Sequence, residues 1–205
     1  MEQGNFNWTS FIAKFPEHLP AFSSKPPWQL TSRAIEIVTE ILSTLSNEYK
    51  IQDGIAIHKS AVIENNVTLK APIILGSGCF VAAYSYLRGG VFLMGYKSIG
   101  PGCEIKSSFI FPNSNLAHFN FVGDSVIGSN VNFEAGSIIA NYFNERKDKE
   151  ISVMINGTRV EIKCEKFGAL VGDGSKIGAN AVLSPGTILT PNSIVRRLEL
   201  IEQLG

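Results

Sequence analysis

The sequence predicts an all-β parallel β-helix that is preceded by a helical segment and interrupted once by a hairpin. Three observations predict it. An aliphatic residue recurs every six positions from residue 55 onward. The first fifty residues show a helical period instead. In one charged segment, apolar residues alternate with other residues on both sides of Asn156-Gly157. We place the boundary between the helical segment (1–50) and the β-helix domain (51–205) where the period changes.

Composition limits the function classes. The 205 residues, 44% of them hydrophobic, suffice for one core with a small appended piece. Lysine plus arginine equals aspartate plus glutamate, 18 each, so we expect neither nucleic acid nor a membrane as a partner. No signal-like start is visible, and three cysteines without CxxC spacing suit a reducing compartment. We therefore expect a cytoplasmic protein without a thiolate metal site.

The first fifty residues predict one amphipathic helix that packs on the main module. Thr31 or Ser32 is its expected N-cap, and the preceding aromatic segment from Phe6 to Phe22 is broken by Pro16 and Pro20. That earlier segment is expected on the surface of the main module or on a neighbouring subunit. The apolar stripe of the helix consists of Ala34, Ile35, Val38, Ile41, Leu42 and Leu45.

The six-residue period is too long for the alternation of one strand and fits no helix. It indicates a short strand plus a turn, repeated, and stacked units bury a continuous aliphatic column. Three units per coil make a triangular prism with strands roughly 4.8 Å apart. We expect a phase slip between residues 112 and 120. The column comprises Ile57, Ile63, Leu69, Leu75, Val81, Leu87, Leu93, Ile99, Ile105 and Phe111, then Phe121, Ile127, Phe133 and Ile139, then Val171, Ile177, Leu183, Leu189 and Val195.

The segment 143–166 breaks this period. It is charged at 145–150, and alternating apolar residues then flank Asn156-Gly157, which is a strong hairpin signal. The hairpin is either a tolerated insertion or a flap over a binding site. We favour the flap, because Asn141 and Lys147 stand at its root.

A reaction that removes a proton near neutral pH and develops an oxyanion needs a base and a hydrogen-bond donor. Histidine and a backbone N–H supply these without a metal. Of the three histidines, His18 lies in the proline-broken start, His58 opens the first coil, and His118 lies in the expected phase slip. There a side chain can leave the column, although a hydrogen-bonded surface histidine remains the alternative.

Arg88 and Lys106 are separated by one full coil, so their side chains should stack on the same face. Like charges stacked side by side on one face repel each other. Two adjacent cations therefore suggest a bound anion, and a phosphate fits best, with a solvated pair as the alternative.

One block resembles a known family. The segments His118-Phe-Asn-Phe-Val-Gly-Asp124, Ile127-Gly-Ser-Asn-Val-Asn132, Ala135-Gly136 and Ala140-Asn141-Tyr142 resemble the acetyltransferase domain of bifunctional glucosamine-1-phosphate acetyltransferase/N-acetylglucosamine-1-phosphate uridylyltransferase, a hexapeptide-repeat transferase. Upstream, Tyr86-Leu87-Arg88-Gly89-Gly90 and Glu104-Ile105-Lys106 fall at the family's spacing. The resemblance covers about residues 55–195, and the hairpin is closer to the archaeal-type branch.

The resemblance implies a left-handed coil, a homotrimer with sites between subunits, and a small-molecule sugar phosphate as substrate. The implied reaction moves an acetyl group from acetyl-CoA to the amine of an amino-sugar 1-phosphate or a nucleotide amino sugar, without a metal. His118 is the implied general base and Glu104 the carboxylate that orients it. A separate nucleotidyltransferase is an expected partner. The implied substrate-binding residues are Arg88, Lys106, Asn132, Asn141, Tyr142 and Lys147, and no CoA-binding residue is assigned.

Two positions depart from the family pattern. Phe121 stands where the family usually has tyrosine, and Glu134 where it often has glycine. Two other functions stay open. One is transfer of a longer acyl chain from acyl carrier protein in lipid precursor synthesis, which shares the fold. The other is a non-catalytic trimer that binds a nucleotide sugar, which Phe121 makes plausible. Turnover of a thioester, followed by release of free thiol, separates the enzymes from the binding protein.

Overall fold

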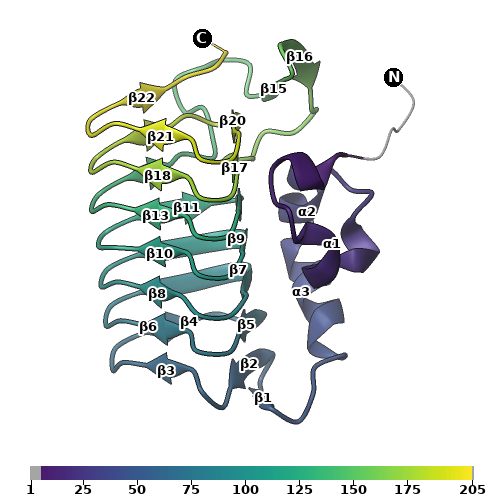
Figure 1. Ribbon diagram of the computed structural model, residues 1–205, viewed down its shortest axis with the longest axis vertical. Helices are drawn as coiled ribbons and strands as arrows, with labels where there is room; N and C mark the ends of the chain where they lie inside the picture. Colours follow the sequence, from purple (N-terminus) through teal and green to yellow (C-terminus); the bar gives the residue numbers. More distant parts are fainter. Residues whose placement is uncertain (1–5, 205) are drawn as a thin grey trace.

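The computed structural model describes residues 6–204 as a triangular prism of parallel strands with helices along one side (Figure 1). Each coil contributes a strand to each of three faces, here called face 1, face 2 and face 3. Val62 lies opposite Phe80, and Phe80 opposite Ser98, so one coil takes eighteen residues there. The predicted fold class, an all-β left-handed parallel β-helix, is confirmed.

The three faces form two sheets. Faces 2 and 3 share one 13-stranded sheet, because β7 (Tyr86–Leu93) and β9 (Glu104–Ile110) run across their common corner. Face 1 is a separate 7-stranded sheet of β3 (Val62–Ile63), β6 (Phe80–Val81), β8 (Ser98–Ile99), β10 (Asn115–Leu116), β13 (Asn132–Phe133), β18 (Lys176–Ile177) and β21 (Ile194–Val195).

The remaining strands of the large sheet divide between the other two faces. β1 (Tyr49–Gln52) pairs antiparallel with the first strand of face 2. Face 2 also holds β2 (Ile55–His58), β5 (Ile73–Leu75), β12 (Val126–Ile127), β17 (Ala169–Val171) and β20 (Thr187–Leu189). Face 3 holds β4 (Thr68–Leu69), β11 (Phe121–Gly123), β14 (Ile138–Ile139), β19 (Val182–Leu183) and β22 (Leu200–Ile201).

The aliphatic column fills the prism as predicted, but the phase slips earlier than expected. The buried column passes from Ile105 to Ile110, one residue short of the period, and is short again from Val122 to Ile127. The β7–β9 pairing accordingly changes register after Arg88. The phase slip expected at 112–120 is therefore wrong. Both shortened steps lie at the corner between faces 3 and 2, where the chain uses one residue fewer than the period.

Two predicted column members consequently lie outside the prism. Phe111 packs against the N-terminal segment, with its ring stacked on Phe15 at 5.4 Å between centroids. Phe121 lies on face 3 and is partly exposed, while its neighbour Val122 fills the column.

The N-terminal segment covers face 2 (Figure 1). The outward side chains of that face are apolar, and burying each one stabilises the fold by roughly 1.5–3 kcal/mol. No helix within residues 6–204 has the length and apolar character of a membrane span. The segment consists of the 3-10 helices η1 (Trp8–Ser10) and η2 (Pro20–Phe22) and the helices α1 (Phe15–His18), α2 (Pro27–Ser32) and α3 (Ala34–Leu42).

The predicted N-cap of α3 is wrong. A separate helix, α2, already contains Thr31 and Ser32, and their hydroxyls donate to the carbonyls of Trp28 and Gln29. Arg33 is the N-cap residue, without a side-chain cap. The buried residues of α3 are Ala34, Ile37 and Val38, whereas Ile35, expected in the stripe, is 55% exposed.

The predicted hairpin is confirmed. β15 (Ser152–Ile155) and β16 (Thr158–Glu161) pair antiparallel, with positive φ at both Asn156 (50°) and Gly157 (75°), as this two-residue turn requires. Ile151 and Val153 are buried in the cluster that covers face 2. The hairpin therefore extends the cover that the helices provide, next to β20 (Figure 1).

Lys97 is a charged residue whose side chain is almost completely buried. It is 3% exposed, and its Nζ donates to the carbonyls of Met94, Ile110 and Phe111 at 3.0, 2.8 and 2.8 Å. Burial lowers the pKa of Lys97 from 10.5 to about 7.

This lowered pKa predicts a pH dependence of stability. Between pH 7 and about 10 the unfolded state binds the Lys97 proton more tightly, so the free energy of unfolding should rise with pH by up to roughly 1.4 kcal/mol per unit. Urea unfolding of the wild type and of Lys97→Met at several pH values tests this. The difference between the two proteins should change with pH across this window, and a pH-independent difference would contradict the assignment.

Candidate functional site

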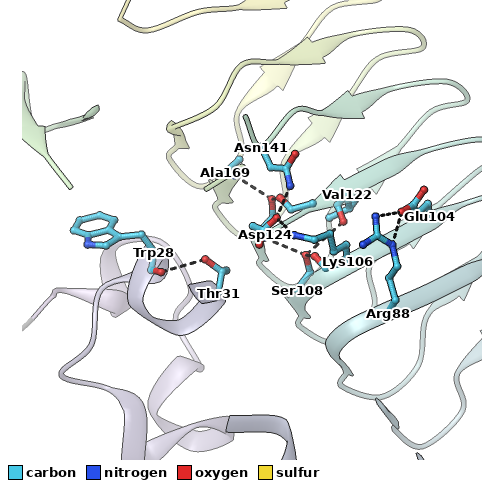
Figure 2. Close-up of polar contacts among 12 residues, drawn as sticks. Trp28, Thr31, Arg88, Glu104, Lys106, Ser108, Val122, Asp124, Asn141 and Ala169 are labelled. Atoms are coloured by element: carbon cyan, nitrogen blue, oxygen red, sulfur yellow. Dashed lines mark hydrogen bonds and ion pairs between the residues drawn. The ribbon is translucent and has the colours of Figure 1, made fainter. Parts of the chain in front are cut away.

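A cluster of charged side chains lies on face 3, where it meets face 2. Arg88 and Lys106 are directly opposite in register, as predicted. Arg88 donates to Glu104 Oε1 through Nε (2.8 Å) and Nη2 (2.7 Å), and Lys106 Nζ lies 2.6 Å from Asp124 Oδ2 (Figure 2). Each cation thus has its own carboxylate, so the stacked charges are compensated within the chain and do not by themselves require a bound phosphate.

Asp124 joins three coils and is the site residue that sequence reasoning left out. It is 5% exposed, and its carboxylate also accepts a hydrogen bond from Asn141 Nδ2. Its backbone N–H donates to Lys106 and its carbonyl accepts from Gly168. The available signal was its place at the end of the block that begins with His118, directly after the strand β11.

His118 lies at the opposite edge of face 3, on the corner turn from face 1. It is exposed, and its ring forms no hydrogen bond within residues 6–204, although its carbonyl accepts from Gly136. The expected displacement by a phase slip is wrong, because this corner is regular. Glu104, the expected orienting carboxylate, contacts Arg88 instead, with no hydrogen bond to His118.

The strand β11 connects these groups in a fixed order. It begins three residues after His118, places Phe121 opposite Glu104 and Gly123 opposite Lys106, and leads directly into Asp124. A ligand lying along this face would therefore meet the histidine at one end and the charged cluster at the other.

Asn132 lies on face 1, beside a groove of about 480 Å³ lined also by Lys176 and Arg196. Glu134 lines the same groove and is held by Arg197 through two contacts of 2.7 and 2.6 Å and by the Ala179 N–H at 2.9 Å. The Arg197 guanidinium, followed by that N–H, lowers the pKa of Glu134. Glu134 is thus poorly suited to replace His118 as a general base.

Tyr142 and Lys147 lie at the root of the insertion. Tyr142 is 36% exposed, and the Lys149 ammonium lies 5.0 Å from its ring centroid. Lys147 is exposed. The structure therefore brings together Arg88, Glu104, Lys106 and Asn141. The side chains of His118, Asn132, Tyr142 and Lys147 form no hydrogen bond with that cluster within the described residues.

Comparison with known proteins gives two kinds of result. No protein-family model matches the chain. Among solved structures, a perosamine N-acetyltransferase from Caulobacter crescentus is 18% identical, with a TM-score of 0.33 over 68% of this chain and 49% of that one. AntD, an N-acyltransferase from Bacillus cereus, is 14% identical, with a TM-score of 0.39 over 77% and 81%. These similarities are too weak to support conclusions about function.

Relatives found by sequence comparison are more similar to this chain than those solved structures are. The bifunctional protein GlmU of Methanococcus maripaludis is 34% identical over 173 residues, 82% of this chain and 41% of that protein. A bifunctional sugar-1-phosphate nucleotidylyltransferase/acetyltransferase of Sulfurisphaera tokodaii is 34% identical over 151 residues, 73% of this chain and 37% of that protein. The chain thus spans about two-fifths of the length of the relatives it matches. The family resemblance of the block around His118 is confirmed, because these relatives match most of this chain.

Proposed function

We propose that this chain transfers an acetyl group from acetyl-CoA to the amine of an amino-sugar phosphate, with His118 as the general base. The observation that carries the proposal is the arrangement along β11, where an exposed histidine without a partner in the described chain shares one face with Arg88 and Lys106. The relative from Sulfurisphaera tokodaii is named a bifunctional sugar-1-phosphate nucleotidylyltransferase/acetyltransferase, which supports acetyl transfer in a sugar-phosphate context.

In the proposed reaction the amine attacks the thioester carbonyl and His118 accepts the proton that the amine loses. Such a base contributes about 10²–10⁴-fold to the rate. The attack forms the C–N bond, the C–S bond breaks as the tetrahedral intermediate collapses, and the departing sulfur takes the proton from His118 and leaves as the thiol of CoA. Glu104 acts through Arg88 in this arrangement, because it holds the guanidinium over face 3.

The phosphate of the acceptor would bind at the charged cluster. The Arg88 side chain is 35% exposed and the Lys106 side chain 18%, so an incoming phosphate reaches Arg88 more easily. Glu104 and Asp124 hold the two cations by ion pairs before the ligand arrives. Asn141, tied to Asp124, would face the same ligand.

The phosphates of acetyl-CoA would fit the groove on face 1. Lys176 and Arg196 line it close to Asn132, and ammonium and guanidinium groups are natural partners of phosphate. Bound there, acetyl-CoA would supply the activated acetyl group from the face that adjoins the His118 corner.

Incubation of the protein with acetyl-CoA and a panel of amino-sugar phosphates, with release of free thiol as the readout, tests the proposal. An acyl carrier protein loaded with a longer chain is the comparison donor. Thiol release only from the carrier protein would favour the lipid-precursor alternative. Nucleotide-sugar binding without thiol release from either donor would favour the non-catalytic one.

We also propose a homotrimer, with the corner between faces 1 and 3 at the subunit contact. Tyr84, Phe119 and Leu198 on this corner are 72%, 71% and 79% exposed, and all three have positive φ. Bulky residues are rare in this backbone conformation, and exposed apolar side chains commonly mark an interface.

Sedimentation velocity should therefore show a trimer at micromolar concentration. Phe119→Ser should shift the protein toward monomer, because it removes apolar contact area from the corner. Tyr96→Ser is the matched control, since Tyr96 is also exposed (67%) at positive φ (45°) but lies on the corner between faces 2 and 1. A monomeric wild type would contradict the trimer.

A further inference from the structure

We infer that the acceptor is a nucleotide-linked amino sugar, because a second cavity continues from the charged cluster on the side away from His118. The inference rests on the proposed function and names its substrate class. The cavity measures about 380 Å³ and lies between α2 and α3, the corner of faces 3 and 2, and the returning end of the insertion. In Figure 2, Thr31 of α2 lies across from Asp124 and Ser108.

The position of the cavity follows from chain order. Gly89, Ser107 and Asp124 line it, and they directly follow Arg88, Lys106 and Gly123. A sugar with its amine at His118 and its phosphate at the cluster would therefore direct the far oxygen of the phosphate into this cavity. A phosphate monoester would end at the cluster and leave the cavity unused, whereas a nucleoside attached through the phosphate would enter it.

The floor of the cavity is held open by local geometry. Gly89 has a φ of +73°, and a Cβ there would lie 2.9 Å from Ser107 Oγ. Ser107 is 9% exposed, and its hydroxyl forms no hydrogen bond within residues 6–204, so it is available to a ligand. The next residue, Gly90, lets the start of α3 approach the corner so closely that a Cβ would clash with the Ala34 backbone.

The lining matches the parts of a nucleoside diphosphate. Glu36 and Glu165 offer carboxylate acceptors for ribose hydroxyls, and Ile35 offers an exposed apolar surface for a base. Lys166 forms no ion pair within the described chain and is placed to meet a second phosphate. The volume falls within the range of roughly 300–1,000 Å³ typical of small-ligand sites.

A tryptophan at Ser32 tests the inference, because Ser32 lines the cavity from the α2 side and does not belong to the charged cluster. Thr39→Trp is the matched control. Thr39 is likewise an exposed hydroxyl residue bonded to a backbone carbonyl of the N-terminal segment, but it does not line the cavity. The assay compares acetylation of UDP-glucosamine and of glucosamine 1-phosphate by all three proteins.

We expect the wild type to favour UDP-glucosamine at least tenfold in kcat/KM. Ser32→Trp should lower that value at least tenfold while leaving glucosamine 1-phosphate unchanged, and Thr39→Trp should change neither. Equal use of both acceptors by the wild type, or an equal loss for both in Ser32→Trp, would overturn the inference.

Calorimetric titration with UDP, dTDP, GDP, CDP and ADP separates this inference from the proposed function, because it needs no acetyl transfer. Binding of at least one nucleotide that Ser32→Trp weakens tenfold and Thr39→Trp does not would support the cavity even if no acceptor were acetylated. Failure of all five to bind the wild type would reject the cavity as a nucleotide site, whatever the protein acetylates.

Discussion

Replacing His118 by alanine is expected to lower kcat about 10²–10⁴-fold, with KM for the acceptor little changed. The reason is that the ring is exposed at the edge of face 3, while the groups proposed to bind phosphate lie at the other end of β11. Steady-state acetylation of an accepted amino-sugar phosphate measures the effect. His58→Ala is the control, since His58 lies in the first coil and bonds to Ser60.

Near-normal kcat in His118→Ala would show that another group accepts the proton. Glu134 would be a poor substitute, because Arg197 engages both of its carboxylate oxygens.

Replacing either cation of the cluster by methionine should raise KM for a phosphorylated acceptor roughly tenfold or more. The loss of a charge-assisted hydrogen bond, worth about 1.5–3 kcal/mol, accounts for that size. Both variants should bind an unphosphorylated amino sugar as the wild type does. If the wild type bound the unphosphorylated sugar as well as its phosphate, the cluster would not be a phosphate site.

The two variants should differ in stability. Lys106→Met leaves the Asp124 side chain, only 7% exposed, without a cation, at a cost of about 3–5 kcal/mol. In Arg88→Met the carboxylate left without a cation is Glu104, whose side chain is already 33% exposed. The loss of such a partly exposed pair costs about 1 kcal/mol or less. Urea unfolding should show this difference. The double variant Lys106→Met/Asp124→Asn should recover stability but not phosphate binding, and a failure to recover would show that Lys106 stabilises the corner by other contacts.

The location of the phase slips shows where sequence reasoning reached its limit. Ile110 and Phe111 are both apolar and both buried, one inside the prism and one beneath the N-terminal segment. Periodicity could not distinguish them, because face 2 is apolar on both its inner and outer sides. Only the packed structure shows which of two adjacent apolar residues points inward.

The charged cluster shows the same limit for the site. Coil spacing predicted that Arg88 and Lys106 would stack, and they do. It could not predict that Glu104 would turn toward Arg88 or that Asp124 would join Lys106 to Asn141. Spacing fixes which backbones are neighbours, whereas the partner of a long side chain depends on rotamers and on the charges around it.

The sequence by itself therefore determined the prism, the hairpin and the stacked cations of this protein, because each follows from a local period or a turn that short segments specify. The tertiary structure decided what covers face 2, which carboxylate neutralises which cation, and where the second cavity lies. That cavity is lined by Ser32, Ser107 and Glu165. These residues are distant in sequence, and only the packing of the helices and the insertion against one corner of the prism brings them together.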